Sequence, residues 1–306
     1  MLTNSFAFSD IFIMQILILI PKGVIMSVFF EFIKVIILGI VEGITEWLPI
    51  SSTGHMIFVD EFLRLSVNED FKNLFFVVIQ LGAILAVVIL FWKKLWPFGY
   101  GEHKIVIKKP IFDMWFHVIV SCIPAIIIGL PFDDFFEKYL YNYVVVALAL
   151  IIFGVAFIMI ENKNKSLRPK INSISQIDYK TAFIIGLFQL IAAIFPGTSR
   201  SGATILGALL IGVSRTVAAE YTFFLAVPVM AGASLLKVVK YGFRYELIEI
   251  AYLAVGMLVA FLVSFYVIKF LMSYIKKHDF KVFGWYRIAL GALVLVYFMA
   301  KSLIAK

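Results

Sequence analysis

The stretch L-G-I-V-E-G-I-T-E-W-L-P-I-S-S-T-G-H, residues 38–55, is the segment around which the fold can be interpreted. It carries two carboxylates, Glu42 and Glu46, whose spacing of four residues places both on one face of a helix. Pro49 and the small polar residues after it interrupt that helix, and His55 closes the segment. One interpretation is that the two acids lie at a helix end that faces water. This explains less well why hydroxyl residues and a histidine follow them so closely. Because an ionisable side chain at membrane depth is costly, we interpret the segment as part of a functional site.

The composition is that of an integral membrane protein. Hydrophobic residues make up 63% of the 306 residues and charged residues only 15%, whereas soluble domains are roughly half apolar and about a quarter charged. Several apolar runs are long enough to cross a bilayer as a helix. The basic residues outnumber the acidic ones, 27 to 19, and most lie in short loops. There they set topology and contact lipid headgroups, so we expect the bilayer and no nucleic acid as a partner.

The apolar runs predict about six transmembrane helices, at residues 74–92, 111–132, 143–160, 219–238, 248–271 and 287–304. The loops after the first, third and fifth of these runs are basic and are expected in the cytoplasm, with the acidic connections outside. Residues 1–25 do not fit this layout, because they lack the basic start and the cleavage site of a secretory signal. We expect Met26 to be the functional start, or residues 1–25 to form a dispensable extra helix.

A second broken segment, residues 186–202, repeats the theme of the first. Five of its residues align with residues of the first segment at one offset, since 189 − 42 and 196 − 49 both equal 147: Gly186, Gln189, Pro196, Thr198 and Ser199 align with Gly39, Glu42, Pro49, Ser51 and Ser52. Each segment is interrupted by proline and glycine, which predicts a re-entrant pair of short helices. Three spans follow each pair, and three is odd, so the second copy is predicted to be upside down relative to the first.

The predicted fold is therefore an all-α polytopic membrane protein with an inverted-topology repeat. It consists of two re-entrant helix pairs plus about six transmembrane helices, in a single membrane domain over residues 26–306. The repeats are expected at about 26–165 and about 175–306. Inverted repeats of this kind place a site near the bilayer midplane, where the broken helices meet.

The two broken segments together bring side chains suited to phosphoryl transfer, which depends on positioning and charge neutralisation. Arg200 in a hydrophobic region requires an anion, and its guanidinium matches phosphate oxygens; a buried ion pair with Glu46 is the alternative. His55 could act as general acid or base with a nearby hydroxyl such as Ser52 as nucleophile. Glu42 and Glu46 are also candidate ligands of Mg²⁺ or Ca²⁺. The candidate substrate-binding residues are Ser51, Thr53, Gly54, Gln189, Thr198, Ser199, Ser201, Gly202 and Thr204.

The chain closely resembles the undecaprenyl-diphosphate phosphatase family of bacterial membranes, the bacitracin-resistance type. Two signatures carry the resemblance, E-G-I-T-E-W-L-P-I-S-S-T-G-H at 42–55 and P-G-T-S-R-S-G-A-T at 196–204, and the hydrophobic layout fits from about Met26 onward. The resemblance implies hydrolysis of undecaprenyl diphosphate to undecaprenyl phosphate and phosphate, which recycles the lipid carrier for cell-wall synthesis. It implies a multi-pass protein of the bacterial inner membrane with its site open to the outer side. The implied catalytic residues are Glu42, Glu46, Ser52, His55 and Arg200.

The resemblance does not fix which group attacks phosphorus. We favour Ser52 as nucleophile with His55 and Glu46 assisting and Arg200 on the diphosphate, and a water directed by His55 or by a Glu-bound metal stays open. We expect no organic cofactor, and a homodimer is left open. A lipid flippase or ion-coupled transporter is the rival function, because inverted repeats with broken helices are also transporter architecture.

Overall fold

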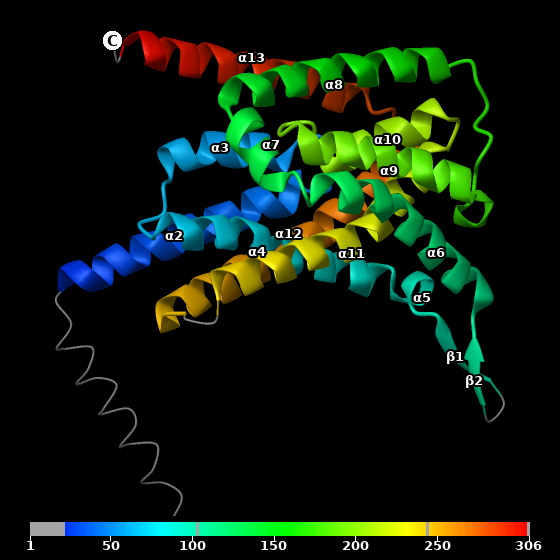
Figure 1. The fold of residues 1–306 in the computed structure, drawn as a ribbon, viewed down its shortest axis with the longest axis horizontal. Coiled ribbons are helices and arrows are strands. Elements are labelled where there is room, and N and C mark those ends of the chain that lie inside the picture. Colours follow the sequence, from blue (N-terminus) through cyan, green and yellow to red (C-terminus); the bar gives the residue numbers. More distant parts are fainter. Residues whose placement is uncertain (1–21, 102–103, 243–244, 305–306) are drawn as a thin grey trace, which may run out of the picture.

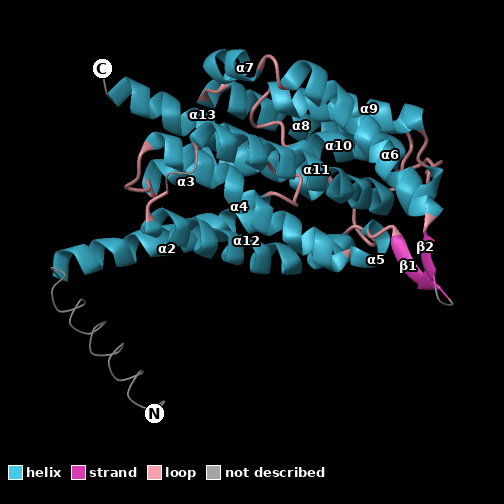
Figure 2. Cartoon of the chain, turned by 60° about the horizontal axis from the view of Figure 1, so that its bottom comes forward, coloured by secondary structure: helices cyan, strands magenta, loops and turns pink. Residues whose placement is uncertain are grey.

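The computed structural model describes residues 22–101, 104–242 and 245–304, and within them the chain is almost entirely helical (Figure 1). The first half contains α2 (Lys22–Thr45), α3 (Ser52–Phe62), α4 (Glu69–Leu90), α5 (Trp92–Leu95), β1 (Phe98–Gly101), β2 (Lys104–Ile107), α6 (Lys109–Pro124), the π-helical turn Ala125–Gly129, α7 (Asp133–Leu140) and α8 (Tyr143–Asn164). The second half contains the 3-10 turn Ile174–Gln176, α9 (Tyr179–Ile194), α10 (Arg200–Leu210), α11 (Arg215–Tyr241), α12 (Leu247–Tyr274) and α13 (Lys281–Ile304). The antiparallel strands β1 and β2 form a small hairpin at one end of the bundle (Figure 2).

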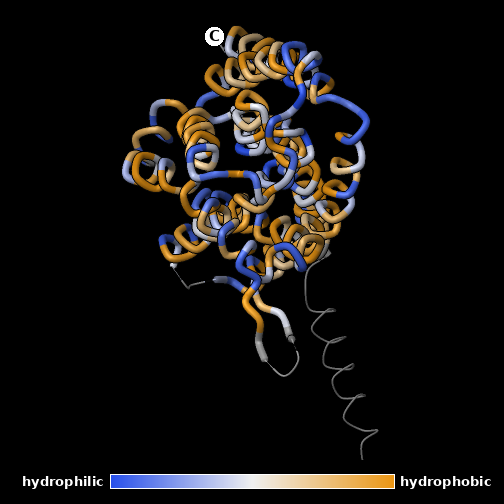
Figure 3. The backbone as a smooth tube through the Cα atoms, turned by 90° about the vertical axis from the view of Figure 1, so that its right-hand side faces the viewer, coloured by the Kyte–Doolittle hydropathy of each residue, from blue (hydrophilic) through white to orange (hydrophobic). Residues whose placement is uncertain are grey.

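Six helices in the described ranges are long and apolar enough to cross a membrane: α4, α6 with its π-helical continuation, α8, α11, α12 and α13. They coincide with the six predicted spans, so the all-α polytopic membrane fold is confirmed. Large apolar side chains such as Phe29, Ile152 and Val296 remain exposed on these helices and on α2. Figure 3 shows hydrophobic residues over much of the outside of the bundle, as expected where lipid rather than water is the solvent.

Both predicted helix breaks are present. The chain leaves helical geometry between α2 and α3, and again between α9 and α10, at the segments that contain Pro49 and Pro196. The first helix is longer than the short helix we expected, because no proline interrupts the run from Lys22 to Thr45. Residues 1–21 of the expected N-terminal extension lie outside the described residues. The division into two repeats of opposite orientation stays a prediction.

Two glycines at corresponding positions of the broken segments let their helices approach a neighbour closely. A Cβ added to Gly39 of α2 would lie 2.9 Å from the carbonyl oxygen of Gly256 in α12. A Cβ added to Gly186 of α9 would lie 2.5 Å from the carbonyl oxygen of Ser121 in α6. Small residues at such contacts allow backbones to pack directly in membrane proteins. Each broken helix is therefore anchored against a helix from the other half of the chain.

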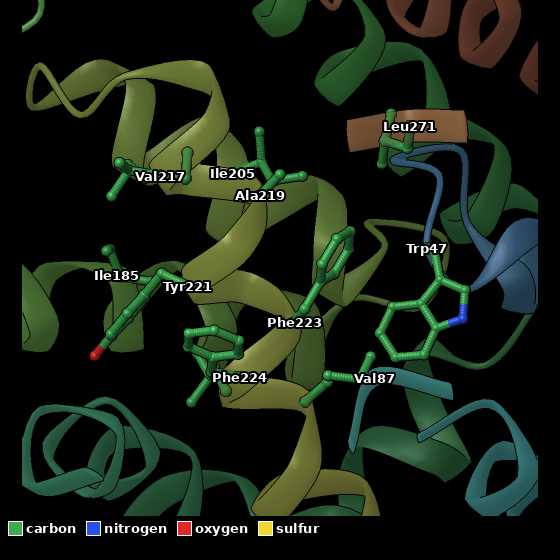
Figure 4. Packing of buried hydrophobic residues seen from close by; sticks show 14 of the residues in the cluster. Trp47, Val87, Ile185, Ile205, Val217, Ala219, Tyr221, Phe223, Phe224 and Leu271 are labelled. Atoms are coloured by element: carbon green, nitrogen blue, oxygen red, sulfur yellow. The ribbon is translucent and has the colours of Figure 1, made fainter. Parts of the chain in front are cut away.

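The largest hydrophobic cluster surrounds the middle of α11 and holds the first turn in place. Trp47, in the turn after α2, is fully buried, and its ring meets Phe223 of α11 edge to face at 5.2 Å between ring centroids (Figure 4). Phe224 and Tyr221, one on either side of that contact along the helix, are buried as well. The turn that carries Glu46 is thus fixed by apolar packing from the second half.

The close α6–α9 approach predicts that Gly186→Ala destabilises the protein, because the new methyl group must displace a backbone carbonyl. We expect a loss of about 1–3 kcal/mol, as for other overpacked positions. Gly232→Ala in α11 is the matched control, since a Cβ there meets nothing within 4 Å, and a helical alanine at an open site is neutral or stabilising. Thermal unfolding of the detergent-purified variants measures both changes. Equal unfolding temperatures for the two variants would contradict the role of Gly186.

Candidate active site

The two turns that start the short helices α3 and α10 share an unusual local geometry. Ser51 and Ser199 are the non-glycine residues of the described chain with positive φ, at 76° and 69°. Each caps its helix: the Ser51 hydroxyl accepts from the amide of Gly54 at 3.2 Å, and the Ser199 hydroxyl accepts from the amide of Gly202 at 3.1 Å. Such strained positions in non-glycine residues are typical of functional sites.

This geometry corrects the alignment of the two segments inside the turns. Ser51 corresponds to Ser199, one residue beyond the Thr198 predicted by the constant offset. The second turn has one residue more between its proline and its helix cap, and Gly197 accommodates it with a φ of 88°. The offset of 147 still relates Glu42 to Gln189, and both of these side chains are buried in the structure.

Glu46 is the point at which the two broken segments meet. The first residue of α3, Ser52, donates its hydroxyl to one carboxylate oxygen of Glu46 at 2.8 Å. The first residue of α10, Arg200, donates a guanidinium N–H to the other oxygen, also at 2.8 Å. The hydroxyl of Ser201 donates to the backbone carbonyl of Glu46 at 3.0 Å. The buried ion pair that the sequence left as an alternative is therefore present, with the Ser52 hydroxyl on the same carboxylate.

A cavity of about 370 Å³ lies beside this cluster. Glu42 and Ser52 line it, together with Thr53 and the ion-paired residues Asp60 and Lys72. Glu42 is almost completely buried, and its Oε1 atom has no hydrogen-bond partner within the described residues. A buried polar atom without a partner needs a ligand, a water or a proton. Among the residues that line the cavity, Glu42 and Asp60 thus each have a buried carboxylate oxygen without a partner, and Ser52 has a hydroxyl bonded to the carboxylate of Glu46.

Both ring nitrogens of His55 are bonded to groups other than Ser52 and Glu46. Its Nδ1 atom lies 2.6 Å from the carbonyl oxygen of Ser51, and its Nε2 atom lies 2.7 Å from the hydroxyl of Tyr286, whose ring stacks on the imidazole. A carbonyl can only accept, so Nδ1 carries the proton and Nε2 accepts from Tyr286. No hydrogen bond joins His55 to Ser52 or Glu46 among the described residues, and His55 does not line the cavity.

The nine predicted substrate-binding residues occupy different places. Thr53 lines the cavity, whereas the others belong to the surrounding scaffold. Ser51, Gly54, Ser199 and Gly202 form the two helix caps, Ser201 holds the Glu46 backbone, and Thr198 is fully buried. Gln189 donates to the carbonyl of Ser121 at the α6–α9 contact. Thr204 bonds the hydroxyl of Thr222 and the carbonyl of Arg200.

The two glutamates differ in what they can offer a divalent cation. Glu42 lines the cavity and has an oxygen without a hydrogen-bond partner, whereas both oxygens of Glu46 are already bonded by Ser52 and Arg200. The described residues contain no group of three or more histidine, cysteine or acidic side chains placed to hold a metal by themselves. A cation bound through one carboxylate and the phosphates of a ligand, the usual mode for Mg²⁺, fits Glu42 and does not fit Glu46.

Fold and site together define a multi-pass helical membrane protein with a buried carboxylate–hydroxyl–arginine cluster beside a polar cavity. The chain belongs to the family of bacitracin resistance protein BacA, whose model matches residues 35–293. It is 65% identical over 274 residues to "Undecaprenyl-diphosphatase" of Desulfitobacterium hafniense, covering 90% of this chain and 98% of that protein. It is also 65% identical over 269 residues to "Undecaprenyl-diphosphatase 1" of Clostridium acetobutylicum (88% and 98% covered), and 61% identical over 269 residues to "Undecaprenyl-diphosphatase" of Enterococcus faecalis (88% and 97% covered).

The Glu46–Arg200 pair predicts a non-additive effect on stability. Arg200→Met alone leaves the Glu46 carboxylate buried without its counter-charge, which we expect to cost about 3–5 kcal/mol of unfolding free energy. Adding Glu46→Gln removes that charge, so the double variant should unfold at a higher temperature than Arg200→Met alone. Thermal unfolding in detergent compares the unaltered protein, the two single variants and the double variant. A double variant less stable by the sum of the two single losses would contradict the pairing.

Proposed function

We propose that this protein is an integral membrane phosphatase that hydrolyses undecaprenyl diphosphate to undecaprenyl phosphate and phosphate, and so recycles a lipid carrier for cell-wall synthesis. The high identity to proteins named undecaprenyl-diphosphatase supports this substrate. The single observation that carries the chemistry is the Ser52 hydroxyl, which lines the cavity and is bonded to the carboxylate of Glu46. A nucleophile within hydrogen-bond reach of a base oriented by a third group is the arrangement that covalent catalysis requires.

In the proposed reaction Ser52 attacks the terminal phosphorus and Glu46 takes its proton. The Ser52 oxygen–phosphorus bond forms, the anhydride bond breaks, and undecaprenyl phosphate departs with the electron pair and with the proton from Glu46. Glu46 then takes a proton from water, the water oxygen bonds phosphorus, and Ser52 leaves with that proton, which frees phosphate. Arg200 holds Glu46 in place at 2.8 Å and supplies positive charge next to the transferring group.

This assignment gives His55 a role different from the one the resemblance implies. Both ring nitrogens are engaged, with the Ser51 carbonyl and the Tyr286 hydroxyl, so His55 is better placed to hold the turn before Ser52 than to accept its proton. Glu46 is the group within hydrogen-bond distance of that hydroxyl. A water nucleophile remains the second route, and the Ser52 variant below separates the two.

A divalent cation, if the reaction uses one, would be held by Glu42 together with the diphosphate oxygens. When bound it would neutralise phosphate charge, which favours departure of the leaving group. Glu42 lines the cavity and has an oxygen without a hydrogen-bond partner, which supports this assignment. Within the protein, Glu42 would then fix the diphosphate close to Ser52, which lines the same cavity.

The site is proposed to open to the outer side of the bacterial cell membrane. Acidic side chains from two connections predicted to lie outside, Glu69 and Glu137, contribute to the lining of the cavity. The positive-inside rule places the basic loops in the cytoplasm, so the connections at the other ends of the same spans lie outside. A homodimer stays a prediction.

The first test is release of phosphate from a long-chain prenyl diphosphate by the detergent-purified protein. Ser52→Ala should lower the rate at least about 1000-fold, as for other lost nucleophiles, and His55→Ala should lower it less. Ser121→Ala is the matched control: its buried hydroxyl donates to the carbonyl of Ala182, neither residue lines the cavity, and activity should be retained. No phosphate release by the unaltered protein would favour the flippase or transporter alternative. Retained activity in Ser52→Ala would exclude Ser52 as nucleophile.

The cation assignment predicts a specific effect of Glu42→Gln. The Mg²⁺ concentration needed for half-maximal activity should rise about 10- to 100-fold, the usual effect of weakening a metal site. Glu137→Gln removes a carboxylate from the cavity rim and should leave this concentration unchanged. Titration of EDTA-treated protein with Mg²⁺ gives both values. Activity that survives EDTA without loss would exclude the cation.

A further inference from the structure

A second arginine, Arg287 of α13, is completely buried in the structure. No carboxylate in the described part of the chain lies within ion-pair distance of it. Within the described residues, all of its hydrogen bonds go to backbone carbonyls. Burying a charge without a counter-ion is costly, so the position of this guanidinium needs an explanation.

The carbonyls that Arg287 binds belong to the two turns of the candidate site. One terminal nitrogen donates to Pro49 at 3.2 Å, and the other donates to Thr198 at 2.7 Å and to Gly197 at 3.0 Å. A longer contact of 3.5 Å joins Nε to the carbonyl of Leu150 in α8. A single side chain thus links the turn that precedes Ser51 to the turn that precedes Ser199.

Close backbone packing leaves the guanidinium little freedom to move. A Cβ added to Gly202, in the first turn of α10, would lie 2.7 Å from the nitrogen of Arg287 that binds Pro49. Helices α8 and α13 lie side by side (Figure 1) and approach closely at two glycines. A Cβ on Gly154 would lie 2.7 Å from the carbonyl oxygen of Gly284. Arg287 therefore projects from a fixed backbone into a fixed slot between the turns.

We propose that Arg287 is a positioning residue, which fixes the two turns against each other so that Ser52 and Arg200 both reach Glu46. Its effect on turnover rests on the proposed phosphatase function, whereas its effect on the turns does not. The planar guanidinium serves both turns because its two terminal nitrogens point to different carbonyls. A lysine ammonium keeps the charge but lacks the fork, so it can hold one turn but not both.

The test is Arg287→Lys, studied in the full chain beside Val294→Ala. Val294 is equally buried on the same helix, about two helical turns beyond Arg287, and packs in a cluster with α8, so it controls for lost α8–α13 packing. We expect Arg287→Lys to lower kcat by about 10- to 100-fold, the cost of misplaced catalytic groups, with KM little changed. Amide hydrogen exchange followed by mass spectrometry should become faster in both turns, residues 46–51 and 195–199. Val294→Ala should lower the unfolding temperature and change neither kcat nor this exchange.

Gly202→Ala keeps the proposal testable if Arg287→Lys does not fold. Its methyl group displaces the nitrogen that binds Pro49, so exchange should rise chiefly in the first turn, with a fall in kcat. Unchanged exchange in the turns of both variants would overturn the proposal, as would a kcat loss in Arg287→Lys no larger than in Val294→Ala. If the unaltered protein released no phosphate while Arg287→Lys still loosened both turns, the phosphatase function would fail and the positioning role would stand.

Discussion

A helix that breaks inside a membrane leaves backbone N–H and C=O groups that lipid cannot satisfy, and this constraint governs the centre of the protein. Two such breaks face each other here, and side chains supply several of the missing partners. Ser51 and Ser199 each accept from the free amide of the third residue of a short helix. Ser201 and Arg287 donate to the carbonyls of the turns. The polar residues that look like a reactive cluster in the sequence are largely the means by which two broken helices are tolerated.

The remaining polar groups are the ones with chemical capacity, and they are few. Glu46 is shared by the first residues of the two short helices, so the separation of those helices determines whether Ser52 and Arg200 can bind it together. Glu42 lines the cavity and keeps a buried oxygen without a partner. Its counterpart Gln189 also has an unpaired side-chain oxygen, but it sits in a helix contact outside the cavity. The two halves therefore share the same helix-cap geometry. Glu42 and Ser52, which line the cavity, both come from the first half.

Much of this arrangement could be predicted from the sequence because its signals are local. The spans follow from apolar runs, the breaks from Pro49 and Pro196, and the acidic face from the spacing of Glu42 and Glu46. The orientation of His55 could not be predicted, because its partner Tyr286 lies 231 residues away. Arg287 did carry a signal, an ionisable residue at the start of the last apolar run, but only the contacts reveal that it binds both turns. The register inside the second turn also required the backbone conformation of Gly197.

The position of Arg287 in the chain has a consequence for biogenesis. The first turn is made early, since Pro49 emerges long before α13, yet one of its carbonyls is bonded by a residue of the last helix. During synthesis and insertion the two broken segments can pack against α4, α6 and α11. The Arg287 guanidinium that links them is added only with the last helix. Because domains assemble as the chain emerges, the site is completed as the final step. A chain that stops before α13 would insert most of its helices but would lack the side chain that links the two turns of the site.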